Sequence, residues 1–121
     1  MRLIYVAGPY RAPTKQGVEA NIYAAQFAAK DLWKQGWAVI CPHANSQGMD
    51  GIVPDETFLE GDLEILRRCD AIYMMAGHEA SVGATNELNE AVKCGLEIIF
   101  EVEQCDVSSS GSMTAGGGEC S

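Results

Sequence analysis

The chain has 121 residues, with 8 Lys or Arg and 17 Asp or Glu, so its formal net charge is −9. Hydrophobic residues make up 47% and charged residues 21%, which excludes a disordered or a fibrous chain. This length suits one domain. The acidic balance argues against a protein that grips a nucleic-acid polymer along a basic face. A small anionic ligand is compatible with it, because one Arg and a helix N-terminus can suffice.

The apolar runs are too short for a membrane protein or a secreted one. None approaches the roughly 20 residues of a membrane-spanning helix, and the first run, Leu3 to Ala7, is too short for a signal peptide. The five cysteines are an odd number without a C-x-x-C pair, which argues against a disulfide framework or a zinc ribbon. We therefore expect reduced thiols, no bound metal and a cytoplasmic location.

Taken along the chain, the first predicted element is a buried strand at 3–7, an apolar run that ends at Gly-Pro. Apolar residues at helical spacing then predict an amphipathic helix from Val18 to Gln35, with Gly36 as its stop. A second strand at 37–40 ends before Pro42. A polar loop with three separated Gly or Pro residues follows.

The second half of the chain repeats this alternation. A capping box, Thr57-x-x-Glu60, predicts the start of a helix that runs through Arg67. The remaining predicted elements are a strand, a helix and a last strand, at 71–75, 85–93 and 96–100. Continuously apolar strands that alternate with helices predict an α/β fold: a three-layer, doubly wound parallel sheet of four to five strands, flavodoxin-like or Rossmann-like.

Composition changes after Gln104. Residues 105–121 read CDVSSSGSMTAGGGECS and hold almost no large apolar side chain. Such a segment cannot bury enough surface to offset the entropy of ordering it. We expect a folded domain at 1–104 and a flexible Gly/Ser-rich tail at 105–121.

Ligands of such sheets bind beyond the carboxyl ends of the strands. After the first strand, Gly8 would let a ligand approach the backbone, and Arg11 would pair with a phosphate or a carboxylate. The alternative is a tight turn with a solvated Arg. The loop has neither a G-x-G-x-x-G pattern nor a P-loop, so we expect no nucleotide cofactor. After the second strand, His43 and Asn45 are candidate substrate contacts, and His43 has no partner at metal-ligand spacing.

The junction between the third strand and the third helix carries the strongest signal. Backbone N–H groups near Ser81 and Gly83 would point outward and favour an anion or a polar sugar edge. Glu87 would lie in about the first turn of the helix, where the dipole favours the ionised form that a nucleophile needs. The alternative is a Glu that merely suits the dipole.

Three further residues have two interpretations each. Tyr5 lies inside the first strand and is either a core tyrosine or one whose hydroxyl finds a functional partner. Asp70 precedes the third strand, at the edge opposite the ligand edge, which argues against a catalytic role. Asp62 belongs to an acidic stretch that reads as a solvated face, although it could also point toward the site.

At these residues the chain resembles the nucleoside 2-deoxyribosyltransferase-like superfamily, particularly an uncharacterised branch of bacteria and phages. The resemblance covers about residues 2–101 and rests on IYVAGPY at 4–10, CDA at 69–71 and an S-x-G-x-x-x-E motif at 81–87. It implies that Glu87 attacks C1′ of a deoxyribose and displaces the base, that Tyr5 orients Glu87, and that Asp70 is an acid near the base or sugar. The substrate-binding residues expected on this basis, together with those from the loops, are Gly8, Tyr10, Arg11, His43, Asn45, Ser81 and Gly83.

The function expected is cleavage or transfer at the N-glycosidic bond of a small (deoxy)nucleoside or nucleoside 5′-monophosphate. A carboxylate stabilises the oxocarbenium-like state and, by analogy with retaining glycosidases, forms a covalent sugar ester. A non-catalytic nucleotide-binding or sensor domain on the same fold is the alternative. We also expect a homodimer or a higher homo-oligomer, because a four-stranded domain buries modest area alone and the resembling families assemble.

Overall fold

The computed structural model describes residues 1–45, 48–49 and 51–102. Its centre is a sheet of parallel strands in the order β2-β1-β3-β4. The strands are β1 (Leu3–Ala7), β2 (Ala38–Ile40), β3 (Ala71–Met74) and β4 (Glu97–Phe100). The expected parallel α/β fold is confirmed. The tail expected at 105–121 lies outside the described residues.

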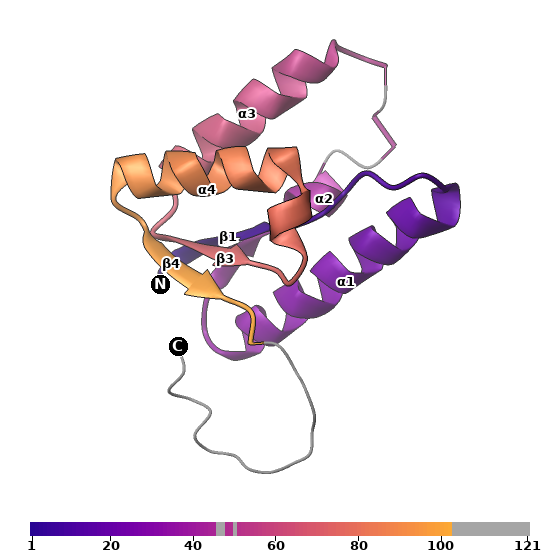
Figure 1. Ribbon diagram of the computed structural model, residues 1–121. Coiled ribbons are helices and arrows are strands. Elements are labelled where there is room, and N and C mark those ends of the chain that lie inside the picture. Colours follow the sequence, from indigo (N-terminus) through magenta and orange to yellow (C-terminus); the bar gives the residue numbers. More distant parts are fainter. Residues whose placement is uncertain (46–47, 50, 103–121) are drawn as a thin grey trace, which may run out of the picture.

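Helices cover both faces of this sheet. They are α1 (Lys15–Lys34), α2 (Pro42–Asn45), α3 (Asp55–Arg67), the 3-10 turn η1 (His78–Ala80) and α4 (Val82–Cys94). In Figure 1, α3 and α4 lie on one side of the strands and the long α1 lies on the other. Within the described residues, no helix is both long and apolar enough to cross a membrane.

Strand β1 supplies both halves of the core. Because successive side chains of a strand point to opposite faces, Ile4 and Val6 pack in the cluster beneath α1. Tyr5 and Ala7 pack in the other cluster, which includes residues of α3 and α4. All four side chains are almost completely buried. Tyr5 therefore reaches the α3–α4 side from the middle of the central strand.

Three helix starts differ from the sequence-based prediction, and two of them differ because of capping. The side chain of Thr14 accepts a hydrogen bond from the Gly17 N–H, so α1 begins at Lys15. Helix α3 begins at Asp55, directly after Pro54, and the prediction that a capping box at Thr57 opens it is wrong. The short helix α2 was not predicted.

Helix α4 also begins earlier than the predicted 85. The hydroxyl of Ser81 accepts a hydrogen bond from the Ala84 N–H at 3.1 Å and caps the helix, which starts at Val82. This cap moves Glu87 from the expected first turn into the second turn. The difference matters for its charge, as described below.

The strand order creates a switch point between β1 and β3. From β1 the chain proceeds to β2 on one side, and from β3 it proceeds to β4 on the other. The connections beyond the carboxyl ends of β1 and β3 therefore diverge. In open α/β sheets, this is the place where ligands bind.

Candidate active site

A hydrogen bond joins the sheet to α4 near this switch point. The hydroxyl of Tyr5 donates to Glu87 Oε2 at 2.7 Å. Tyr5 is fully buried, so its hydroxyl has an obligatory partner inside the protein. Burial and the neighbouring charge of Glu87 raise the pKa of Tyr5 far above its usual range. Tyr5 thus remains a neutral donor that holds one carboxylate oxygen of Glu87.

Burial also governs the charge of Glu87. Desolvation raises its pKa to about 7, against the lowering effect of the hydrogen bond from Tyr5. Burial therefore opposes the ionised form that the helix dipole is expected to favour. The dipole acts mainly within the first turn of a helix, whereas Glu87 lies in the second turn and faces the sheet. Near neutral pH, Glu87 exchanges between its two protonation states.

A second carboxyl group, Asp62 of α3, belongs to the same site. Its charge contributes to the raised pKa of both Glu87 and Tyr5. Burial raises the pKa of Asp62 itself to about 6. Sequence reasoning left Asp62 either on a solvated face or pointing toward the site. Its spacing of four residues from Phe58 and from Leu66, both apolar, was the signal that it shares their side of the helix.

The structure does not bring Asp70 to this site. Its carboxylate accepts a hydrogen bond from the Leu3 N–H at 2.8 Å, and the Asp70 N–H donates to the Leu3 carbonyl at 2.9 Å. Both contacts lie where β1 and β3 begin, at the amino edge of the sheet. Asp70 thus connects two strand starts, in agreement with the doubt raised by its position in the sequence.

The loop after β1 carries three candidate substrate-binding residues, Gly8, Tyr10 and Arg11, which differ in their exposure. Gly8 is buried, and a Cβ there would lie 2.6 Å from Met75 Sδ, so close packing against Met75 accounts for the glycine. Tyr10 is 40% exposed. The Arg11 guanidinium is largely exposed, 3.7 Å from Asp55 at the start of α3. Tyr10 and Arg11 are accessible to a ligand at the carboxyl edge.

His43 is occupied in holding this loop. It is buried, and its Nε2–H donates to the Pro9 carbonyl at 2.7 Å. Burial lowers the pKa of His43, which favours the neutral ring. The ring also meets Tyr10 edge-on, with centroids 5.7 Å apart. Asn45 is exposed at the end of α2. His43 therefore positions the β1 loop from α2.

The start of α4 remains open to a ligand. Gly83 is exposed, and a Cβ there would have its nearest neighbour, Ser81 Oγ, 4.0 Å away. The Ser81 hydroxyl is engaged by the Ala84 N–H but keeps a proton to donate. Backbone N–H groups at this end of α4 are available for an anion.

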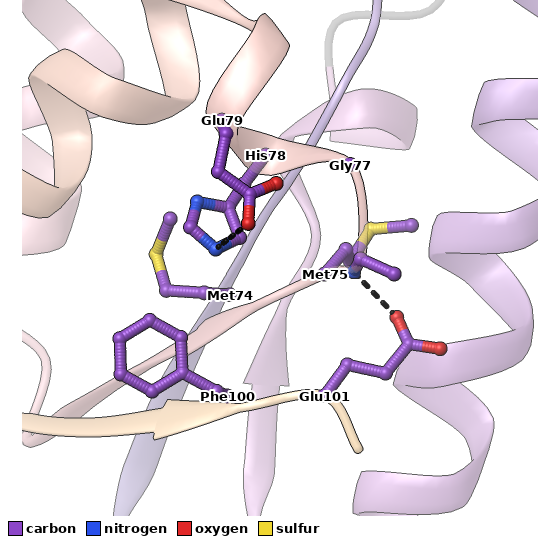
Figure 2. Close-up of a pocket in the computed structure, with 8 residues that line it drawn as sticks. Met74, Met75, Gly77, His78, Glu79, Phe100 and Glu101 are labelled. Carbon is purple, nitrogen blue, oxygen red and sulfur yellow. Dashed lines mark hydrogen bonds and ion pairs between the residues drawn. The ribbon is translucent and has the colours of Figure 1, made fainter. Parts of the chain in front are cut away.

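A small pocket lies at the carboxyl edge of β3 and β4, shown in Figure 2. The ring of His78 approaches that of Phe100, with centroids 5.6 Å apart. The Ala76 N–H donates to Glu101 Oε1 at 2.7 Å. The lining residues are Met74, Met75, Ala76, Gly77, His78, Glu79, Phe100 and Glu101. This pocket is not lined by the side chains of Tyr5, Asp62 or Glu87. It is therefore separate from the carboxyl pair, by which we mean Asp62 and Glu87.

The part of the chain that the structure describes contains no cluster of three or more His, Cys, Asp or Glu side chains that could hold a metal ion.

Two solved enzymes share this fold. A 2-deoxyribosyltransferase from Bacillus psychrosaccharolyticus has a TM-score of 0.60 and 19% identity, over 84% of this chain and 77% of that chain. A 2-deoxyribosyltransferase from Leishmania mexicana has a TM-score of 0.60 and 20% identity, over 83% of this chain. The match spans 63% of the Leishmania chain. The protein thus has the fold of 2-deoxyribosyltransferases.

The comparison of sequences assigns the chain to a particular family within this fold. Residues 2–100 match the model of a domain of unknown function, DUF4406, and the chain belongs to this family. No curated protein matches the chain.

Proposed function

We propose that the protein cleaves or transfers at the N-glycosidic bond of a (deoxy)nucleoside or a nucleoside 5′-monophosphate, with Glu87 as the nucleophile. The observation that carries this proposal is the 2.7 Å hydrogen bond from Tyr5 to Glu87, whose pKa the half-buried carboxyl group of Asp62 helps to raise. The fold shared with 2-deoxyribosyltransferases and the S-x-G-x-x-x-E motif that ends at Glu87 support the same function.

In the first step, a Glu87 carboxylate oxygen forms a bond to C1′ of the sugar while the bond from C1′ to the base nitrogen breaks. The electron pair of that bond stays with the base, which takes a proton from Asp62. The product is a sugar ester of Glu87, as in retaining glycosidases. Attack on C1′ by water then gives hydrolysis, and attack by a nitrogen of a second base gives transfer; in each case the proton of the attacking group passes to the Asp62 carboxylate. Glu87 leaves as a carboxylate in either case.

The first step needs Glu87 ionised and Asp62 protonated, so the pair must hold one proton. The pKa values of about 7 for Glu87 and about 6 for Asp62 place the singly protonated pair near neutral pH, with the proton mainly on Glu87 before the substrate binds. The first step therefore requires transfer of this proton from Glu87 to Asp62. The O–H of Tyr5 stabilises negative charge on Glu87 and so lowers the free-energy cost of this transfer.

The rest of the site would bind the sugar. Arg11 and the start of α4 at Ser81 and Gly83 lie beyond the carboxyl ends of neighbouring strands, and both favour an anion. We assign them to the 5′ end of the substrate, where a phosphate would be held. Gly8 and His43 support the loop that carries Arg11, and Tyr10 and Asn45 lie exposed near it.

A non-catalytic nucleotide sensor is the second candidate. The specific observation in its favour is that the pocket beside His78 and Phe100 does not include Glu87. In a sensor, a nucleotide would bind without any change to its glycosidic bond.

Incubation with a panel of deoxynucleosides and their 5′-monophosphates distinguishes the two candidates. Free base is measured by chromatography, and binding by calorimetry. The enzyme proposal predicts base release that is lost in Glu87→Gln, a variant that keeps the shape of the side chain. Binding of a nucleotide without release of any base would support the sensor instead.

A further inference from the structure

Helix α1 exposes an apolar stripe on the face opposite its core contacts. Tyr23 is 70% exposed and Phe27 is 69% exposed, although both are large aromatic residues. Ala20 and Ala24 are exposed one helical turn from them. The helix buries its other face, through Ile22, Ala25, Ala29 and Leu32, against the sheet. An aromatic stripe of this kind on an otherwise packed helix marks an interaction surface.

We propose that this stripe, consisting of Ala20, Tyr23, Ala24 and Phe27, is the contact through which two copies of the chain form a dimer. The order of its residues is the first argument, because it is self-complementary. If two α1 helices pair antiparallel about a twofold axis between Tyr23 and Ala24, Tyr23 of each copy faces Ala24 of the other. Phe27 of each copy then faces Ala20 of the other. Each large side chain meets a small one, as a twofold interface requires.

Charge complementarity is the second argument. Glu19 and Lys30 are both exposed, and the 100° rotation per residue of an α-helix places them on the same flank of the stripe. The same twofold axis brings Glu19 of one copy beside Lys30 of the other, with an offset of about two residues along the helices. Two symmetry-related ion pairs would therefore border the aromatic contact. Both would lie at the rim, where charges set register and specificity.

A second copy matches this stripe better than the remainder of the same chain does. Residues 103–121 contain no aromatic residue and are dominated by Gly, Ser and other small or polar residues. Helix α1, which carries the stripe, lies on the side of the sheet opposite α4, which carries Glu87 (Figure 1). A dimer through α1 would thus leave the carboxyl pair of each copy uncovered by the other copy's α1.

Sedimentation equilibrium of the full chain at micromolar concentration tests the proposal. We expect a mass of twice 13.0 kDa for the unmodified chain. Tyr23→Lys places a charge at the centre of the stripe and should give a monomer. The matched control is Val92→Lys on α4, where a valine that is 63% exposed lies on the other side of the sheet. That variant should remain a dimer.

A charge exchange tests the register and does not depend on folding of the Tyr23 variant. Glu19→Lys alone and Lys30→Glu alone should each weaken dimerisation, and the double variant Glu19→Lys/Lys30→Glu should restore it. Circular dichroism verifies that each variant is folded. A monomeric unmodified chain, a folded Tyr23→Lys variant that stays dimeric, or a double variant weaker than either single one would overturn the proposal. None of these measurements uses a substrate, so they are independent of the proposed enzymatic function.

Discussion

Tyr5 and Glu87, 82 positions apart in the chain, meet through a hydrogen bond of 2.7 Å between the hydroxyl and Oε2. The contact connects the middle of β1 to the second turn of α4. Its formation requires β1 to direct odd-numbered side chains toward the α3–α4 side and Ser81 to start α4 early enough to turn Glu87 inward. One pairing of side chains thus depends on strand register and on helix capping together.

Removal of the Tyr5 hydroxyl should shift the pH dependence of base release. Its hydrogen bond lowers the pKa of Glu87, so Tyr5→Phe should raise that pKa and move the activity profile to higher pH. Activity at neutral pH should fall because less Glu87 is ionised. The control is Tyr73→Phe, which removes a hydroxyl on the α1 side of the sheet. An unshifted profile for Tyr5→Phe would show that the hydrogen bond does not tune Glu87.

Substitution of Asp62 should affect the reaction, whereas substitution of Asp70 should affect stability. Asp62→Asn removes the proposed proton donor and should lower kcat by about 10²–10⁴-fold, the usual contribution of general acid catalysis. It also removes a charge that raises the pKa of Glu87, so a bell-shaped pH profile should become a single rise at lower pH. Steady-state kinetics across pH measures both effects.

Asp70→Asn is the matched comparison. It should leave the kinetics of the folded protein near normal and lower the free energy of unfolding by about 1 kcal/mol, through the weakened bond to the Leu3 N–H. Urea unfolding measures this loss. A large loss of kcat with unchanged stability would return Asp70 to the active site.

Stability should fall as the pH rises through the interval in which Glu87 ionises. In the unfolded chain its carboxyl group has the ordinary Glu pKa of 4.5, and in the folded protein this pKa is about 7. Between these values the folded state binds more protons, so the free energy of unfolding decreases with rising pH. The Glu87→Gln variant should have a flatter dependence. Urea titrations at pH 4.5, 6 and 8 compare the two; an equal slope in both would contradict the raised pKa.

Gly8 and Gly83 should respond oppositely to alanine. At Gly8 the new Cβ would lie 2.6 Å from Met75 Sδ and 2.8 Å from Met75 Cβ. Gly8→Ala should therefore destabilise the fold by about 1–3 kcal/mol, the usual cost of overpacking. Gly83→Ala meets nothing closer than 4.0 Å and should keep or slightly increase stability. Thermal unfolding of the two variants shows whether close packing or conformational freedom explains the glycine at position 8. Similar melting temperatures for Gly8→Ala and Gly83→Ala would exclude close packing as the explanation.

The sequence was sufficient to predict the parts of the fold that depend on local pattern. Short apolar runs identify the four strands, and the central strands β1 and β3 are apolar because both of their faces are covered. Helix starts were less predictable, since Thr14 and Ser81 act through capping hydrogen bonds that spacing alone does not reveal. The charge state of Glu87 and the place of Asp62 depend on how α3 packs beside α4, which is a tertiary property. The one local sign that Asp62 lies at the site was its spacing of four residues from the apolar residues Phe58 and Leu66.

The most direct measurement of the central claim is chemical identification of the residue that bonds to the sugar. The protein is mixed with a slowly reacting deoxynucleoside, quenched in acid, digested and examined by mass spectrometry. We predict a deoxyribosyl adduct on Glu87 in the unmodified chain, and none in Glu87→Gln. Base release by the unmodified chain with an adduct on another residue, or continued release at a near-normal rate by Glu87→Gln, would contradict the assignment of Glu87 as the nucleophile.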